Sequence, residues 1–372
     1  MERTDSGRSR RLVLSGKLGW IGVDIGTHTV KLAQAMRTSS GIALRHAAVI
    51  QRTNSWSDDD NLAMSPPEES QAEIRAALEC GDFRGRSAAC LLPMNVCELR
   101  GLKVPLGDPE ERRAMIANEL ADDWVERPTS MEFDFWEVSV DKGAETPESF
   151  NVNVISVAQP WVSQLAGDCR QASLDCWAID GTPPAIARAV GMAARLRSDQ
   201  RVLAIDWGFS NATLCVVGND RPLYARRLHE CNFRRCLDAI QAEFGVSLDR
   251  AQHIVDQHGV LGADGTASGD RSIQEALTYA IDDTVRQLVE ETQRTLRFFE
   301  SQRRQLRPSA VWLMGGGASM RNVAPHLCKL LELPVHVWSV PQDPQGSFPP
   351  GANRATLFGN ALALSALAWR AA

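Results

Sequence analysis

One pattern occurs twice in this sequence, about 180 residues apart, and it limits the folds open to the chain. In each copy an apolar strand leads to an aspartate, a glycine follows two residues later, and a short polar turn opens a second strand. The copies read LGWIGVDIGTHTVKLA from Leu18 and VLAIDWGFSNATLCVV from Val202. One repeat separated by half a chain indicates two similar domains that face each other, and ligands of such folds usually lie between the halves.

The elements around the first copy repeat around the second. Side chains alternate in polarity over Leu18 to Asp24, His28 to Ala35 and Ile42 to Ile50, which predicts an antiparallel meander. The same order of strands and turns returns from Arg201. We therefore expect a disordered arm at residues 1–17, a first half at 18–198 and a second half at 199–372.

An inserted segment of the first half, about residues 92–157, has its own pattern. Val96 to Val104 reads as a strand, and a capped helix with acids in its first turn runs from Pro109 to about Arg127. Phe133 to Val140 and Asn151 to Val157 alternate with a period of two, which predicts neighbouring strands. We expect these elements to form an insertion subdomain on the first half.

Composition narrows the partners and the compartment. A net charge of −6 gives no general attraction to phosphate backbones, so nucleic acid is not expected as a partner. The nine cysteines contain no C-x-x-C pair, which indicates reduced cytosolic thiols rather than a disulfide framework or a zinc site. Its longest apolar stretch, Thr356 to Trp369, is interrupted by Asn360 and Ser365 and predicts a buried helix rather than a membrane span.

The two hairpins carry residue types that suit a polyphosphate and a metal ion. Each aspartate, Asp24 or Asp206, ends a strand where its carboxylate can face a hydrated magnesium ion. The glycine lets the backbone approach a ligand closely, and the polar turn supplies N–H donors. Either motif alone also fits a plain hairpin turn, but the pair is more specific.

A third motif is the run of three glycines at 315–317, which follows the apolar strand Ala310 to Met314. We expect these glycines to open a helix whose N-terminus faces the ligand. The sequence contains neither G-x-G-x-x-G nor G-x-x-x-x-G-K-[ST], which leaves Rossmann and P-loop sites without support.

The fourth motif is a helix from about Ile281 to Gln302. Its buried stripe is expected to consist of Ile281, Val285, Leu288, Thr292, Leu296 and Phe299. Glu291 and Arg294 lie off this stripe, where they could reach the sugar of a nucleotide. An ion pair between them on the helix surface explains them equally well.

In this order and spacing the four motifs resemble those of the superfamily of actin, heat-shock chaperones and sugar kinases. Four segments narrow the resemblance to the PilM family of type IV pilus assembly proteins, which is related to FtsA: GVDIGTHTVK, VPLGDPEERRAMIANELADDW, GASMRNVAPHLCKLLELPVHVW and LFGNALALSAL. The resemblance covers nearly the whole chain from Leu18. It implies an α/β, actin-like ATPase fold of two duplicated halves, with mixed sheets flanked by helices.

The resemblance also implies a site for ATP and Mg²⁺. Its first phosphate loop would consist of Asp24, Gly26, Thr27, His28, Thr29 and Lys31. The second would consist of Asp206, Gly208, Ser210, Asn211 and Thr213. Glu291 and Arg294 would approach the ribose and base, together with Gly315, Gly316, Gly317 and Ala318. Asp24 and Asp206 would contact the metal through water.

The family further implies a cytoplasmic platform of the pilus, or of a related secretion system, that binds the N-terminal peptide of a PilN-like partner at the inner membrane. We expect weak ATPase activity at most, and self-association stays open. One rival is a small-molecule kinase, which needs a base that the sequence shows nowhere beyond the two loop aspartates. The other is an FtsA-like filament protein, but the expected C-terminal amphipathic membrane helix is not found before Ala372.

Overall fold

The computed structural model describes most of the chain. The described residues are 17–39, 41–52, 70–124, 130–138, 149–194, 196–197, 199–228, 230–262, 265, 267, 269–302, 306–340 and 354–369. The arm expected at residues 1–17 lies outside this part except for Lys17. The last three residues of the helix expected to reach Arg127 and the end of the strand expected to reach Val140 also lie outside it.

Two five-stranded sheets share one topology. The first sheet has the order β3-β2-β1-β4-β8 and the second has the order β11-β10-β9-β12-β13. Their strands are β1 (Leu18–Ile25), β2 (Thr29–Thr38), β3 (Gly41–Gln51), β4 (Ser87–Leu92), β8 (Asp175–Gly181), β9 (Val202–Trp207), β10 (Ala212–Gly218), β11 (Arg221–Leu228), β12 (Val311–Met314) and β13 (Val335–Val337). In each sheet a meander of three antiparallel strands is extended by two parallel strands. The mixed, duplicated sheets predicted from the repeated motif are confirmed.

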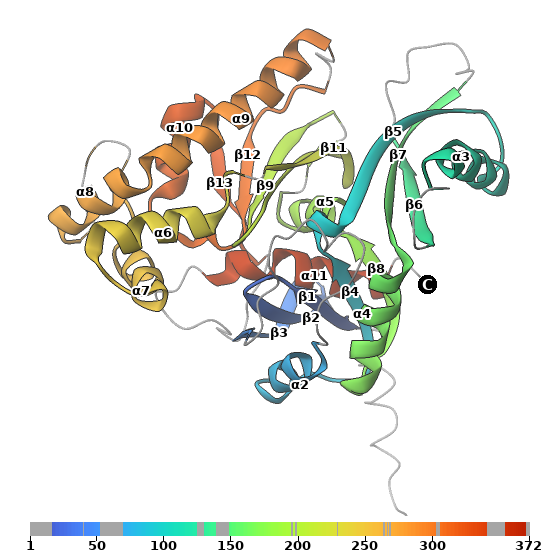
Figure 1. Cartoon of the computed structure of the whole chain (residues 1–372), viewed down its shortest axis with the longest axis horizontal. Helices are drawn as coiled ribbons and strands as arrows, with labels where there is room; N and C mark the ends of the chain where they lie inside the picture. Colours follow the sequence, from blue (N-terminus) through green and yellow to red (C-terminus); the bar gives the residue numbers. More distant parts are fainter. Residues whose placement is uncertain are drawn as a thin grey trace, which may run out of the picture.

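Helices cover the outer faces of both sheets and fill the space between them. The first sheet is covered by α2 (Gln71–Glu79) and α4 (Gln159–Gln171). Between the sheets lie α5 (Thr182–Ala194) and α11 (Gly359–Ser365), which share one apolar core with both sheets. The second sheet is covered by α6 (Phe233–Phe244), α7 (Leu248–His258), α8 (Arg271–Ala280), α9 (Asp282–Gln302) and α10 (Val323–Leu331). Figure 1 shows this layering, with α11 at the centre.

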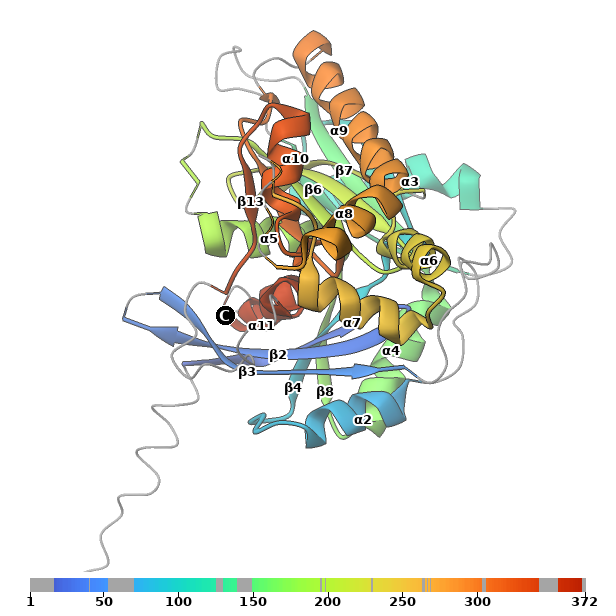
Figure 2. The same cartoon turned by 90° about the vertical axis from the view of Figure 1, so that its left-hand side faces the viewer.

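Helix α11 packs directly on the first sheet, as Figure 2 shows beside β2. At Gly22 the contact is so close that a Cβ atom would lie 1.9 Å from the carbonyl oxygen of Ala361. The hydroxyl of Ser365 accepts a hydrogen bond from the Ala35 amide at 2.8 Å and donates one to the carbonyl of Trp20. Residues 359–365 are all buried, so the stretch that predicted a buried helix forms one.

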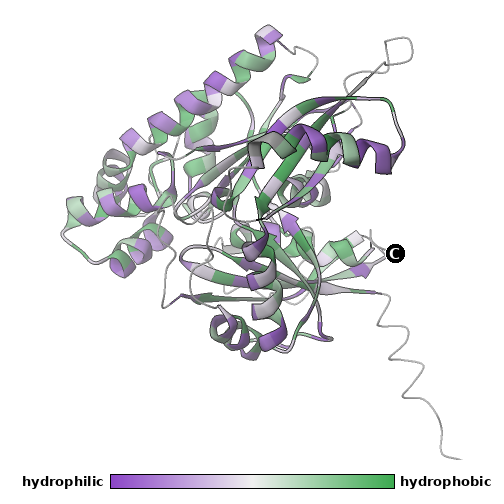
Figure 3. Cartoon of the chain, turned by 45° about the vertical axis from the view of Figure 1, so that its right-hand side comes forward, coloured by the Kyte–Doolittle hydropathy of each residue, from purple (hydrophilic) through white to green (hydrophobic). Residues whose placement is uncertain are grey.

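The long helix α9 has the predicted buried stripe, and both hydrophilic and hydrophobic residues appear along it in Figure 3. All six stripe positions are buried: Ile281, Val285, Leu288, Thr292, Leu296 and Phe299. No helix in the described part of the chain combines the length and the apolar character needed to cross a membrane.

The inserted segment forms a small α/β unit of its own. It consists of β5 (Cys97–Pro105), α3 (Pro109–Trp124), β6 (Met131–Glu137) and β7 (Ser149–Ala158), and its antiparallel sheet has the order β5-β7-β6. It reaches across to the second half, where the indole N–H of Trp136 donates to the carbonyl of Pro222 at 2.6 Å. We call this unit, residues 97–158, the insertion subdomain.

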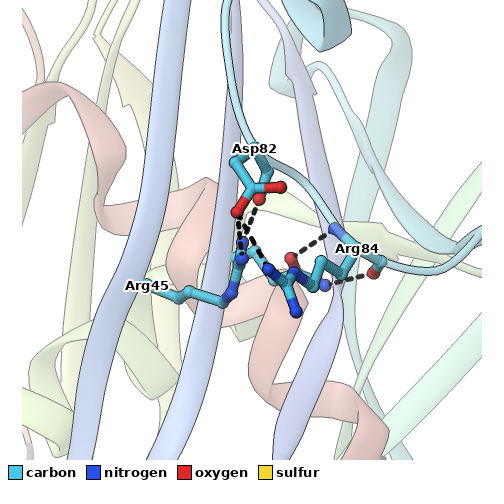
Figure 4. Close-up of polar contacts among 4 residues, drawn as sticks. Arg45, Asp82 and Arg84 are labelled. Atoms are coloured by element: carbon cyan, nitrogen blue, oxygen red, sulfur yellow. Dashed lines mark hydrogen bonds and ion pairs between the residues drawn. The ribbon is translucent and has the colours of Figure 1, made fainter. Parts of the chain in front are cut away.

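The loop between α2 and β4 is attached to the first sheet by polar contacts (Figure 4). The guanidinium of Arg45 on β3 binds the carboxylate of Asp82 at 2.6 Å. Buried Gln34 on β2 accepts a hydrogen bond from the Arg84 amide at 2.9 Å and donates one to the Arg84 carbonyl at 2.7 Å. These contacts hold the chain where it enters β4, a strand that leads toward the space between the halves.

Candidate functional site

The turns of the two repeated hairpins touch each other between the halves. In the first turn the Gly26 amide donates to the Thr29 carbonyl at 2.9 Å. In the second, a Cβ atom at Gly208 would lie 2.6 Å from the Asn211 carbonyl oxygen, so only glycine fits. The hydroxyls of Thr27 and Ser210 are hydrogen-bonded at 2.5 Å. The repeated motif therefore brings two segments about 180 residues apart into direct contact.

A cavity of about 490 Å³ opens beside these turns, which is within the range of ligand sites in proteins. Both hairpins and the start of the glycine run line it. The predicted site residues among its walls are Asp24, Gly26, Thr27, His28, Thr29, Lys31, Asp206, Gly208, Ser210, Asn211, Thr213, Gly315 and Gly316. The structure thus brings most of the expected nucleotide site together in one place.

The two aspartates of the cavity have different partners. Asp24 forms an ion pair with Lys31 at 2.8 Å, and both side chains are largely buried. Asp206 accepts a hydrogen bond from the amide of Asn360 at 2.8 Å. Burial, together with the negative charge of Asp24, raises the pKa of Asp206 to about 6. A cation in the cavity would relieve this repulsion.

A buried arginine supports the first turn from behind. Arg52, at the end of the meander, donates from its guanidinium to the Gly26 carbonyl at 3.0 Å. The same group binds the carboxylate of Glu73 and the hydroxyl of Ser70, each at 3.0 Å. Arg52 therefore fixes the first turn to α2. No local sequence pattern marks this residue, because a single arginine after a strand is common.

The glycine run adopts a different structure from the one expected. Residues 317–319 form a single 3-10 turn, and an α-helix begins only at Val323, so the expectation that the glycines open a helix is wrong. Three glycines in succession disfavour a helix because of their backbone freedom. Gly315 instead adopts a φ of +84°, and a Cβ atom there would lie 2.5 Å from a carboxylate oxygen of Asp206.

The last two residues of the predicted loop are buried rather than exposed to the cavity. Gly317 packs on the indole of Trp207 so closely that a Cβ atom at position 317 would lie 2.3 Å from that ring. Ala318 is fully buried. Neither is among the described residues that line the cavity. The bulky Trp207 points away from the site and into the core of the second half.

Glu291 and Arg294 on α9 are also not among the described cavity residues, so the geometry does not support their contact with a nucleotide sugar. Arg226 on β11 binds the Glu291 carboxylate at 2.6 Å. Arg294 forms the i,i+3 ion pair with Glu291 at 2.8 Å. The structure therefore has the ion pair between Glu291 and Arg294, which was one of the two interpretations of the sequence. No sequence pattern indicated that Arg226 also binds Glu291.

The cavity has further polar walls that no motif indicated. Thr356 and Asn360 come from the segment that contains α11, Asn95 follows β4, and α7 contributes Asp249, Gln252 and Asp256. The side-chain oxygens of Asn95 and Asn360 are buried without a hydrogen-bond partner among the described residues. Two such acceptors in one cavity favour a ligand that donates hydrogen bonds.

Two halves of identical strand order, with a ligand-sized cavity between paired Asp-x-Gly hairpins, define an actin-like ATPase fold. The comparison with protein families agrees, because the profile described as "Type IV pilus assembly protein PilM" matches residues 22–344. The chain belongs to this family, which assigns it to type IV pilus assembly. The resemblance inferred from the sequence is confirmed.

Solved structures show the same fold. One is the structure of a PilM-PilN type IV pilus biogenesis complex, which matches with a TM-score of 0.73 and 22% sequence identity. The match covers 94% of this chain and 98% of the other chain. Another is the ethanolamine utilization protein EutJ from Carboxydothermus hydrogenoformans, with a TM-score of 0.50 and 14% sequence identity. This match covers 92% of this chain and 89% of the other chain. No curated protein sequence matches the chain.

Proposed function

We propose that the chain binds ATP with Mg²⁺ in the cavity and acts as a cytoplasmic platform of the type IV pilus, or of a related secretion system, at the inner membrane. One observation carries the nucleotide part of the proposal. Two Asp-x-Gly hairpins from duplicated halves line one cavity of nucleotide size. The family carries the pilus part.

The residues present fit a metal-bound triphosphate. The turns at Gly26 and Gly208 offer backbone N–H groups to phosphate oxygens, and Lys31 adds an ammonium group in the same wall. Asp24, Asp206 and the free acceptor of Asn360 are oxygen groups, which hydrated Mg²⁺ prefers as partners for its water molecules. Bound Mg²⁺ would supply the positive charge that lets both carboxylates face the same phosphates.

Titration calorimetry with Mg-ATP tests nucleotide binding. We expect Asp24→Asn and Asp206→Asn each to weaken the affinity at least tenfold, because each removes a charge that faces the metal. Asp134→Asn is the matched control, since Asp134 lies on the insertion subdomain with its side chain 82% exposed. Equal affinity of all four proteins, or no binding by the wild type, would contradict this function.

The nucleotide would act as a conformational ligand more than as a fuel. The Thr27 and Ser210 hydroxyls lie 2.5 Å apart, so a triphosphate placed between the turns must separate them and change the angle between the halves. We expect little hydrolysis, because the two loop aspartates, the bases that the sequence offers, already have cationic or amide partners. A phosphate-release assay should give turnover well below about 1 s⁻¹.

The partner part of the proposal concerns the insertion subdomain. In its sheet β5 is an outer strand, so its edge can pair with an extended peptide. The start of β5 packs against the first half, which places this edge near that half. The similar solved structure contains PilM together with PilN, which supports the N-terminal peptide of a PilN-like membrane protein as this ligand. Such a peptide would bring the chain to the inner membrane.

Fluorescence anisotropy with the labelled N-terminal peptide of the PilN-like protein tests this part. Leu99→Asp, on β5, should weaken binding at least tenfold, because it places a charge beside the peptide backbone. Leu330→Asp on α10 is the control, a partly exposed leucine on the other half of the molecule. A peptide with no measurable affinity, or equal losses in both variants, would contradict the proposed peptide site at the edge of β5.

A further inference from the structure

Three cysteines from three elements of the first half bring their sulfur atoms together. Cys90 is on β4, Cys169 on α4 and Cys176 on β8, and their sulfurs all lie within 4.8 Å of one another. Cys90 Sγ is 3.0 Å from Cys169 Sγ and 4.0 Å from Cys176 Sγ. Among the residues that the structure describes, no other three histidine, cysteine or acidic side chains place their ligand atoms so close together.

The cysteine cluster (Cys90, Cys169 and Cys176) is buried in apolar surroundings on one side and accessible to solvent on the other. Cys90 and Cys169 are fully buried in the apolar core beneath the outer face of the sheet. Cys176 is only partly buried, because β8 is the edge strand of the sheet. Figure 1 shows β4, β8 and α4 side by side. Small solutes can therefore reach Cys176 but not the other two directly.

The strand register favours a bound ion over a disulfide between Cys90 and Cys176. Cys176 pairs with Ala88, and Cys90 pairs with Ile179, so the two cysteines are diagonal neighbours. Neighbouring strands lie about 4.8 Å apart and rise about 3.3 Å per residue, so residues two positions apart across this parallel pair are about 8 Å apart. This exceeds the usual Cα separation of a disulfide, about 4.4–6.8 Å. Their sulfurs nevertheless approach to 4.0 Å. Two thiolates at about 2.3 Å from one metal ion in a trigonal site have a similar separation, about 4 Å.

We propose that Cys90, Cys169 and Cys176 bind one thiophilic metal ion, Zn²⁺ or Cu⁺, as thiolates. Soft sulfur ligands select these ions over Mg²⁺ or Ca²⁺. Three thiolates suffice for Cu⁺, while Zn²⁺ takes water as a fourth ligand on the side of Cys176. Cys90 and Cys169 must move apart by about 1 Å to reach metal-bound separation. Binding releases the thiol protons, so affinity rises with pH.

The position of the site gives the ion a structural role. Cys90 lies before the insertion subdomain in the chain, and Cys169 and Cys176 lie after it. A metal ion bound to all three would therefore hold together the two ends of the chain from which the insertion subdomain extends. This inference does not depend on nucleotide binding, since no cysteine of the cluster lines the nucleotide cavity.

The test uses the full chain, reduced with a phosphine under anaerobic conditions and treated with chelator. Titration with Co²⁺, a spectroscopic substitute for Zn²⁺, should give a thiolate-to-cobalt charge-transfer band that saturates at one ion per chain. Zn²⁺ should displace the band and raise the thermal midpoint. Cys176→Ser should abolish the band and the thermal shift. Cys328→Ser, a partly buried cysteine of α10 outside the cluster, should keep both.

Metal-free thermal melts and circular dichroism establish that both variants fold. Absence of the Co²⁺ band in a wild type that also takes up no Cu⁺, or equal metal uptake by Cys176→Ser, would overturn the proposal. A wild type that takes up no metal and loses two thiols on treatment with a hydroperoxide would also overturn the proposal. That result would assign the cluster to disulfide chemistry. Mg-ATP calorimetry on Cys176→Ser should match the wild type, which separates failure here from failure of the nucleotide site.

Discussion

The imidazole ring of His28 lies parallel to the phenyl ring of Phe209, with ring centroids 4.1 Å apart and planes 9° apart. His28 belongs to the turn of the first half and Phe209 to the turn of the second. Burial lowers the pKa of His28, which favours the neutral form of the stacked ring. This stack and the adjacent hydroxyl contact hold the two turns together.

Phe209→Ala should loosen the contact between the turns. An aromatic pair contributes about 0.5–1.5 kcal/mol beyond its buried area, so we expect a loss of about 1 kcal/mol in unfolding free energy. Hydrogen exchange should also become faster at Gly26 to His28. Phe298→Ala on α9, which removes a ring contact with Tyr224, is the control for the exchange measurement. Unchanged exchange in Phe209→Ala would show that the stack does not hold the turns.

Asp206→Asn should stabilise the protein without nucleotide, by an amount that depends on pH. The carboxyl has a pKa of about 6 in the folded protein and near 3.8 when unfolded. Below pH 4 it is protonated in both states and contributes nothing. Between pH 4 and 6 the unfolded state loses the proton first, so wild-type stability falls, and above pH 6 the deficit is constant at about 1–3 kcal/mol.

Thermal melts of wild type and Asp206→Asn from pH 4 to 8, without Mg²⁺, measure this difference. The gap in midpoint should open as pH rises to 6 and then level off. A gap that is constant over the whole range would mean that Asp206 does not titrate in this window. Addition of Mg-ATP should narrow the gap at pH 7, since a tenfold difference in affinity stabilises the wild type by about 1.4 kcal/mol more than the variant.

Arg52→Met should be strongly destabilising. It removes one partner of a buried ion pair and a donor to the Gly26 carbonyl, a change that costs about 3–5 kcal/mol. Arg86→Met is the matched control, because Arg86 pairs with Asp175 at 3.7 Å on the exposed surface, where the cost is below about 1 kcal/mol. Urea denaturation measures both, and similar losses would mean that Arg52 does not fix the turn.

The paired hairpins could be predicted because an Asp-x-Gly turn between apolar strands is a local pattern, and its repetition implied facing halves. Contacts between distant segments could not. Asn360, which lies in a helix 154 positions after Asp206, donates a hydrogen bond to that aspartate. Arg226, which lies in a strand without a motif, binds the Glu291 carboxylate. The cysteine cluster has no C-x-x-C spacing, so only the packing of α4 on β4 and β8 reveals it.

Gly22→Ala should separate α11 from the first sheet. The added methyl group would overlap the Ala361 carbonyl, and the helix must shift, which we expect to cost about 2–4 kcal/mol. Gly167→Ala in α4 is the control, since a Cβ atom there meets nothing within 4 Å. That change should stabilise by about 0.5–1 kcal/mol, because alanine favours a helix. Calorimetric unfolding that shows equal effects would contradict the close contact at Gly22.

The packing of α11 on β1 also sets an order of events during synthesis. All strands of the first sheet have left the ribosome once Gly181 emerges, but the helix that covers its inner face follows 178 residues later, at Gly359. Helix α5 follows directly and covers part of that face, but at about 5–20 residues per second the part over β1 and β2 waits roughly 10–40 seconds for α11. The nascent first half is therefore a candidate client for chaperones, and its maturation waits on translation of the second half.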